Sequence, residues 1–240
     1  MNTPAIMSFS GGKDSVYALY RNSLSGEFVI RSLVATISRD FDRVSMHGVR
    51  RELLELQAAA LRLPLELVYV AAAPDNRQYV ERTNAVFASW RQRSVEHVVF
   101  GDLFLEDLRA WRQRQLAAIG MRGAYPIWRM DTAAVARDFI ALGFRAVLVC
   151  VDTGKLPAAF AGREFDNHLL TDLPPGVDPC GENGEFHTFV YHGPLFHKAV
   201  PIAPGQTVIR GQFSYRDLLP VEPVPPSANV EPMPPSAGHS

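Results

Sequence analysis

Cysteine is scarce in this sequence: Cys150 and Cys180 are the two cysteines among 240 residues. Two cysteines so far apart in the chain exclude a disulfide framework and a cysteine-based zinc cluster. Long apolar runs are also missing. No apolar stretch approaches the roughly 18 residues that a membrane-spanning helix needs. The N-terminal stretch MNTPAIMSFSGG has neither the basic region nor the apolar core of a secretory signal. We therefore expect a cytoplasmic protein without a membrane partner.

The sequence also lacks an excess of charge of either sign. Its 24 Lys and Arg residues nearly balance 25 Asp and Glu residues, for a formal net charge of -1. Without a global basic field, nucleic acid is not an expected partner. The 240 residues are enough for one large domain or two modest ones.

Short apolar runs alternate with helical patterns in the first half of the chain. The predicted strands cover 5–9, 28–38, 65–71 and 95–102, and the predicted helices begin near Asp14 and cover 47–63 and 76–93. This alternation predicts an α/β fold with a parallel doubly wound sheet. Ligands of such sheets bind at the carboxyl ends of the strands. The glycine turn at 10–12 and the pair Gly101-Asp102 both fall there.

The second half predicts a smaller lobe and a tail. A helix over about 131–142 and a strand over 144–153 are followed by a loop-rich stretch. We expect an α/β domain over 1–123 and a second lobe over 124–219 that carries part of the site and binds substrate. Residues 220–240 are rich in Pro and Ser without an apolar period, which predicts a disordered tail.

A strand, the turn Ser-Gly-Gly-Lys-Asp-Ser at 10–15 and a helix follow one another near the N-terminus. Glycines let backbone amides approach an anion, and the helix start adds the positive end of its dipole. Ser10 and Ser15 can donate hydrogen bonds, and Lys13 adds a charge. Asp14 either caps the helix start or holds Mg²⁺ against phosphate oxygens. The alternative is an ordinary tight turn before a helix, and the flanking strand and helix favour nucleotide binding.

A second polar cluster, Gly-Glu-Asn-Gly-Glu-Phe-His at 181–187, precedes an apparent strand. Two carboxylates, an amide and an imidazole in one turn can bind an amine, orient a nucleophile or move a proton. From this segment alone, a structural hairpin turn is an equally good interpretation.

Together the two segments resemble the diphthine–ammonia ligase-like (diphthamide synthetase-like) ATP pyrophosphatases of the PP-loop, or adenine nucleotide alpha-hydrolase, superfamily. The segments 47–65, 101–112, 125–128, 142–156 and 162–174 are also similar to that family. The resemblance implies a nucleotide alpha-hydrolase fold with ATP across the carboxyl ends of the sheet. It also implies that the C-terminal motif lines the acceptor pocket. Asn183 and His187 depart from the family motif, where a glycine and an acid are typical, so diphthine as the acceptor stays open.

The predicted site combines these two segments with a few residues between them. The predicted catalytic residues are Lys13, Asp14, Glu182 and Glu185; the predicted nucleotide-binding residues are Ser10, Gly11, Gly12, Lys13, Asp14, Ser15, Thr36, Gly101 and Asp102; the predicted acceptor-binding residues are Arg109, Asn183, Gly184 and His187; and the predicted metal ligand is Asp14. Arg109 has a solvated helix face as its alternative. His47 is either an N-terminal helix cap or a site residue, and the cap is favoured.

The resemblance implies an ATP-dependent ligase that adenylates a carboxylate and displaces AMP with ammonia or an amine. ATP is then a cosubstrate and Mg²⁺ its expected companion. Two alternatives remain: a tRNA-modifying adenylating enzyme, which the charge balance and the lack of a Cys-x-x-Cys pair disfavour, and a non-catalytic adenine-nucleotide sensor. The identity of the acceptor and a homodimeric assembly stay open.

Overall fold

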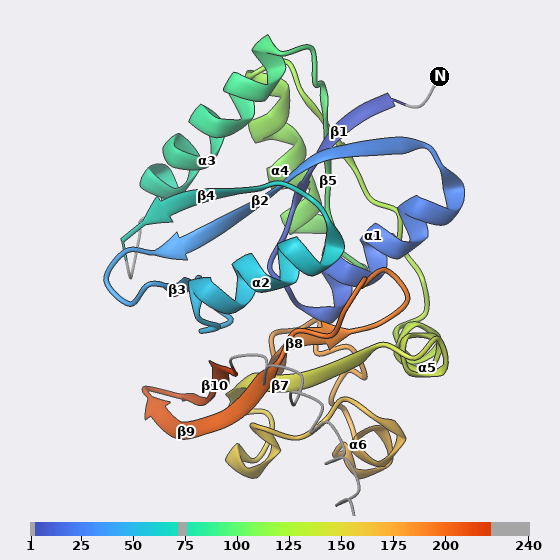
Figure 1. The fold of residues 1–240 in the computed structure, drawn as a ribbon, viewed down its shortest axis with the longest axis vertical. Helices are drawn as coiled ribbons and strands as arrows, with labels where there is room; N and C mark the ends of the chain where they lie inside the picture. Colours follow the sequence, from blue (N-terminus) through green and yellow to red (C-terminus); the bar gives the residue numbers. More distant parts are fainter. Residues whose placement is uncertain (1–2, 72–75, 222–240) are drawn as a thin grey trace, which may run out of the picture.

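The computed structural model describes residues 3–71 and 76–221 (Figure 1). The predicted tail lies outside the described residues from position 222 onward. None of the helices in the described ranges is both long enough and apolar enough to cross a membrane.

The N-terminal part of the chain forms a mostly parallel sheet of six strands. These are β1 (Thr3–Ser8), β2 (Phe28–Ser38), β3 (Arg43–Val44), β4 (Leu65–Val70), β5 (His97–Val99) and β6 (Arg122–Ala124). The order is β3-β2-β1-β5-β6, with β4 also paired to β2. Only β3 runs antiparallel to its neighbour. The predicted α/β class and parallel sheet are confirmed.

Helices cover both faces of this sheet, as the doubly wound prediction requires. They are α1 (Lys13–Ser25), α2 (Arg51–Leu61), α3 (Asn76–Gln92) and α4 (Glu106–Ala118). Successive strand residues point to opposite faces. Ile6 therefore packs with Phe87 and Leu116 of α3 and α4, whereas Ala5 and Met7 belong to the larger core on the side of α1 and α2.

The rest of the described chain forms a second part, made of an antiparallel sheet and short helices. Its elements are α5 (Thr132–Ala141), β7 (Arg145–Asp152), the short 3-10 helix η1 (Ala158–Phe160), α6 (Asn167–Asp172), β8 (Phe186–His192), β9 (Ile202–Arg210) and β10 (Phe213–Pro220), with strand order β8-β7-β10-β9. The loop-rich prediction for the end of this part was wrong for β9 and β10. Strand β9 contains Pro204 and Gly205. Both residue types are depleted in strands, and they interrupt the alternation of apolar and polar residues that would have indicated a strand.

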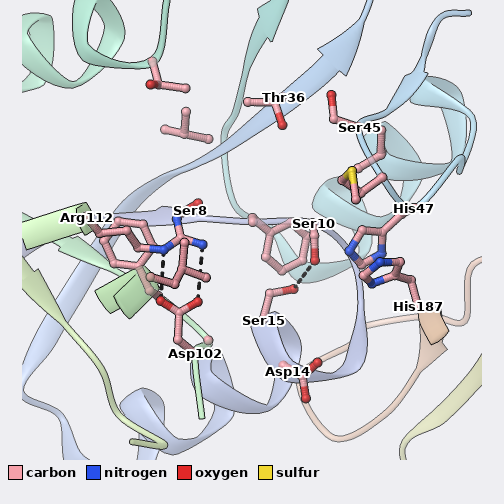
Figure 2. A pocket seen from close by; sticks show the side chains of 18 of the residues that line it. Ser8, Ser10, Asp14, Ser15, Thr36, Ser45, His47, Asp102, Arg112 and His187 are labelled. Atoms are coloured by element: carbon pink, nitrogen blue, oxygen red, sulfur yellow. Dashed lines mark hydrogen bonds and ion pairs between the residues drawn. The ribbon is translucent and has the colours of Figure 1, made fainter. Parts of the chain in front are cut away.

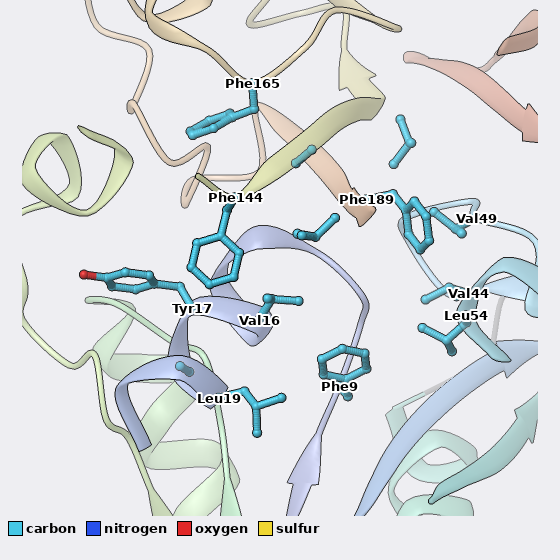
Figure 3. Close-up of a cluster of buried hydrophobic side chains, with 14 of the residues drawn as sticks. Phe9, Val16, Tyr17, Leu19, Val44, Val49, Leu54, Phe144, Phe165 and Phe189 are labelled. Carbon is cyan, nitrogen blue, oxygen red and sulfur yellow. The ribbon is translucent and has the colours of Figure 1, made fainter. Parts of the chain in front are cut away.

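The two sheets share one hydrophobic core. Figure 1 places α1 and α2 between them, and α1 contacts β8 while α2 contacts β10. In the core, Phe9, Val16 and Leu54 of the N-terminal part join Phe144 and Phe189 of the second part (Figure 3). This shared core holds β8 against the turn at 10–12.

Candidate functional site

A cavity of about 450 Å³ opens at the carboxyl ends of β1, β2 and β5. Its walls are the start of α1, the inner sides of α3 and α4, and the loop that leads into β8 (Figure 2). The predicted site residues that line it are Ser10, Lys13, Asp14, Ser15, Thr36, Gly101, Asp102, Glu182, Gly184 and His187. The fold thus brings most of the two sequence segments together around one space.

The glycine turn is fixed from two sides. Gly11 has a φ of +77°, a conformation that favours glycine. Its carbonyl accepts hydrogen bonds from Gln57 Nε2 at 3.0 Å and from the Val190 amide at 3.0 Å. Gln57 Nε2 also donates to the Val190 carbonyl at 2.6 Å. Helix α2 and strand β8 therefore both hold the turn in place.

The start of α1 faces the cavity. Gly12 is the N-cap, and no side chain caps the helix there. The Ser15 hydroxyl donates to the Gly12 carbonyl at 2.9 Å and lies 3.3 Å from the Ser10 hydroxyl. The Lys13 amide donates to Thr188 Oγ1 of β8 at 3.0 Å. This arrangement leaves the positive end of the helix dipole and the Ser10 hydroxyl for an anion.

Lys13 is nearly inaccessible, with 3% of its surface exposed. Its Nζ lies 2.8 Å from both carboxylate oxygens of Asp14 and also donates to the Cys180 carbonyl. Burial disfavours the ammonium, but Asp14, together with the nearby Cys180 and Glu182, outweighs burial and raises the pKa of Lys13 above its ordinary value. Lys13 therefore stays charged and links the loop to the turn before β8.

Glu182 reaches from the second part of the chain across to the first. Its Oε1 accepts a hydrogen bond from the Leu103 amide at 2.9 Å, just after β5. Burial, and then the carboxylates of Asp14 and Asp102, raise the pKa of Glu182 to about 7. A carboxyl group with that pKa can take up or release a proton near neutral pH, as a general base must.

Two predicted residues of the same motif do not line the cavity. Glu185 is 3% exposed, and its Oε1 accepts hydrogen bonds from the Asp178 amide at 3.1 Å and from Asn183 Nδ2 at 3.2 Å. Lys155 Nζ donates to the Asn183 carbonyl at 2.6 Å. In the structure these contacts hold the turn that presents Glu182.

Arg112, which the sequence did not single out, takes the position on α4 that was expected of Arg109. Arg112 lines the cavity, and its Nε lies 3.0 Å from Asp102 Oδ2. Arg109 is absent from the lining, and its guanidinium lies 4.9 Å from the ring centre of Tyr125 and 4.5 Å from that of Trp128.

His47 lies in the cavity wall rather than at a helix end. Helix α2 begins at Arg51, so the helix-cap interpretation of His47 was wrong. Its ring lines the cavity with its centre 4.5 Å from that of His187. Burial lowers the pKa of His47 to about 4, and burial also lowers the pKa of His187. Both imidazoles are therefore neutral at pH 7.

The wall between α3 and α4 was also missed. It carries Tyr79, Thr83 and Asn84 of α3 and Trp111 and Gln115 of α4. The polar side chains of α3 could have indicated a binding surface on that helix. That α4 packs opposite them cannot be predicted from the sequence. The wall offers both aromatic surface and hydrogen-bonding groups to a ligand.

No group of three or more His, Cys, Asp and Glu side chains that could hold a metal occurs within 3–71 and 76–221. Mg²⁺ in nucleotide sites needs fewer protein ligands, because one or two carboxylates combine with phosphate oxygens and water. Asp14 lines the cavity, and 28% of its side chain is exposed. The donor set present at the loop therefore suits Mg²⁺ that arrives with a nucleotide.

Comparisons with known proteins agree with this arrangement. Residues 2–123 match the diphthamide synthase N-terminal domain, and residues 131–218 match the diphthamide synthase C-terminal domain. The chain is 26% identical to the diphthine–ammonia ligase of Danio rerio, over 86% of this chain and 89% of that protein. It is 24% identical to the diphthine–ammonia ligase of Rattus norvegicus, over 83% of each.

Proposed function

This chain belongs to the diphthamide synthase family, and we propose that it is an ATP-dependent ligase that converts a carboxylate into an amide. The observation that carries the proposal is that the phosphate-type turn at the start of α1 and the titratable Glu182 line one cavity. In this proposal residues 1–123 bind ATP and residues 124–219 present the acceptor.

The first half-reaction needs an anion site and charge neutralisation. The triphosphate lies at the start of α1, where the helix dipole and the Ser10 hydroxyl favour negative charge. A carboxylate oxygen of the acceptor attacks the α-phosphorus of ATP. The bond between the α-phosphorus and the oxygen that bridges to the β-phosphorus breaks, and pyrophosphate leaves. Lys13 and Arg112, which are paired with Asp14 and Asp102, place N–H donors beside the developing negative charge. Bound Mg²⁺, held by Asp14, would neutralise phosphate oxygens.

The second half-reaction needs a base. Ammonium or a protonated amine must lose a proton before its nitrogen lone pair can attack the acyl carbon of the adenylate, and AMP is the leaving group. Glu182 is the proposed base, because its pKa of about 7 lets it accept a proton near neutral pH. Thr36 and the α3–α4 wall enclose the remainder of the nucleotide.

The test is product analysis. The full chain is incubated with ATP, Mg²⁺, ammonium and a pool of carboxylic acids that includes diphthine, and the nucleotides are separated. AMP and pyrophosphate that depend on an added acid, together with its amide, are the expected result. ATP that is bound but stays intact with every acid, or that is split to ADP, would refute the ligase.

A further inference from the structure

We propose that His47 and His187 form the subsite for the nitrogen nucleophile, and that this subsite selects ammonia. The inference rests on the proposed function, since it names the part of the same cavity that takes one substrate. Figure 2 shows the two rings together beside Ser10 and Ser15, on the side of the cavity away from the Asp102–Arg112 pair.

The fold holds His47 in this place through a constrained turn. Met46 has a φ of +67° and Gly48 a φ of +71°, and such backbone strain in a non-glycine residue gathers at functional sites. Tyr215 of β10 packs on the turn, because a Cβ at Gly48 would lie 2.7 Å from its ring. The Arg43 guanidinium donates to the Gly48 carbonyl at 2.8 Å and to Asp217 Oδ1 at 2.8 Å. The second sheet thus fixes the loop that carries His47.

The two rings offer lone pairs rather than charge. His47 Nδ1 lies 3.2 Å from the Thr188 carbonyl, which can only accept, so this nitrogen carries the proton and Nε2 carries a lone pair. The His187 ring stacks on the His47 ring. Burial and the nearby Lys13 charge keep both imidazoles neutral.

A pair of neutral acceptors selects a small donor. Ammonia has three N–H groups and can donate to the acceptor nitrogens of the two rings, which line the cavity. An anion gains nothing from lone pairs, and a bulky amine finds little room between the rings and the Gly12 turn, where a Cβ would already lie 2.8 Å from His47 Cε1. The Lys13 charge that disfavours imidazolium also favours ammonia over ammonium.

Ammonium loses one proton to Glu182, and the nitrogen lone pair forms the C–N bond to the acyl carbon. The C–O bond to the α-phosphate then breaks, and AMP leaves with that electron pair. A second proton passes from the new amide nitrogen to water, and Glu182 returns its proton to water.

The experiment reads ammonium binding without turnover. The full chain, labelled with ¹⁵N in its histidine rings, is titrated at pH 8 with ammonium chloride while long-range ¹H–¹⁵N NMR spectra are recorded. Parallel titrations use sodium chloride and tetramethylammonium chloride, which supply charge without N–H groups. We expect saturable shifts of His47 Nε2 and a His187 nitrogen with ammonium alone. Equal shifts with sodium or tetramethylammonium, or no saturable shift, would overturn the subsite.

Matched variants separate this role from packing. His187→Phe keeps the ring stack and removes both nitrogens, so ammonium affinity read at His47 should fall about tenfold, the value of one hydrogen bond. His187→Gln keeps an acceptor and should recover most of the affinity, while His192→Phe at the exposed end of β8 should change nothing. Unchanged affinity in His187→Phe would refute the proposal. Ammonium-specific shifts in a chain that never forms AMP would refute the ligase and leave the subsite standing.

Discussion

The Nζ of Lys13 lies 2.8 Å from both carboxylate oxygens of Asp14, its neighbour in the chain. This contact explains why a turn built for an anion carries an acid. The carboxylate keeps a buried ammonium charged and turned toward the Cys180 carbonyl. The loop itself is therefore close to electrically neutral, and the attraction for phosphate comes largely from the helix start.

Asp14→Asn should destabilise the fold, because it leaves the ammonium of Lys13 buried without its counter-charge. We expect a loss of about 3 kcal/mol in the free energy of unfolding, measured by urea denaturation. Asp42→Asn is the matched control: it breaks the exposed ion pair with Arg51, which should cost less than about 1 kcal/mol. Equal losses in the two variants would contradict this account of the pair.

Glu182 should impose a pH dependence on the reaction. Its pKa of about 7 predicts that the amide-forming rate rises with pH as the carboxylate forms, with a midpoint near 7. Glu182→Gln should be slow and should lose this rise. A wild-type rate that is flat between pH 6 and 8 with saturating ammonium and ATP would contradict the assignment.

The Glu182 carboxyl group should also make the stability of the fold depend on pH, with stability falling as pH rises. The pKa of Glu182 is raised in the folded state from 4.5 to about 7, so the native state binds more protons than the unfolded state between those values. Stability must therefore fall as pH rises through this window. Relative to wild type, Glu182→Gln should gain stability from pH 5 to pH 8. The difference is measured by urea denaturation at the two pH values, and a constant difference would argue against a raised pKa.

Gly101→Ala should disturb the start of α1. An added Cβ would lie 2.7 Å from the carbonyl carbon and oxygen of Asp14 and 2.8 Å from the Ser15 amide, all of them backbone atoms. We expect a loss of about 2 kcal/mol in stability and weaker ATP binding, measured by urea denaturation and calorimetry. Gly154→Ala is the control, because its nearest neighbour is a side-chain oxygen at 3.3 Å. Unchanged ATP affinity in Gly101→Ala would mean that the helix start does not hold the nucleotide.

Arg112 and Arg109 should respond differently to replacement by Leu. Arg112→Leu removes a cavity charge and leaves Asp102 without its ion pair, so the rate should fall about 100-fold. Arg109→Leu should cost about 1 kcal/mol of stability through its lost contacts with Tyr125 and Trp128 while leaving the rate nearly unchanged. The measurement is AMP formation under saturating ATP. If Arg109→Leu lost more activity than Arg112→Leu, Arg109 would be the substrate-binding residue.

The α/β alternation and both polar motifs were readable from the sequence because each is local. Strand β2 was predicted over the residues it occupies, and the glycine turn at 10–12 lies between a strand and a helix as expected. The choice between Arg109 and Arg112 was not readable. It depends on Asp102, Tyr125 and Trp128, which reach α4 from other elements.

His47 was misassigned for a similar reason. A histidine shortly before a helical pattern is compatible with a cap, and the local sequence contains nothing against it. The turn at Met46–Gly48 is held by Tyr215, Arg43 and Asp217, and two of these residues lie in β10 at the far end of the chain. Likewise, Glu185 was expected to be catalytic, but its burial among Asp178 and Asn183 appears only in three dimensions.

The hydrogen bonds that β8 makes to the glycine turn have a consequence for synthesis. The Lys13 amide donates to Thr188, the Gly11 carbonyl accepts from Val190 as well as from Gln57, and the Lys13 ammonium donates to the Cys180 carbonyl as well as to Asp14. A nascent chain that has released only its first sheet from the ribosome lacks Thr188, Val190 and Cys180. The capacity to activate ATP should therefore appear late in translation, so that an unfinished chain does not consume nucleotide.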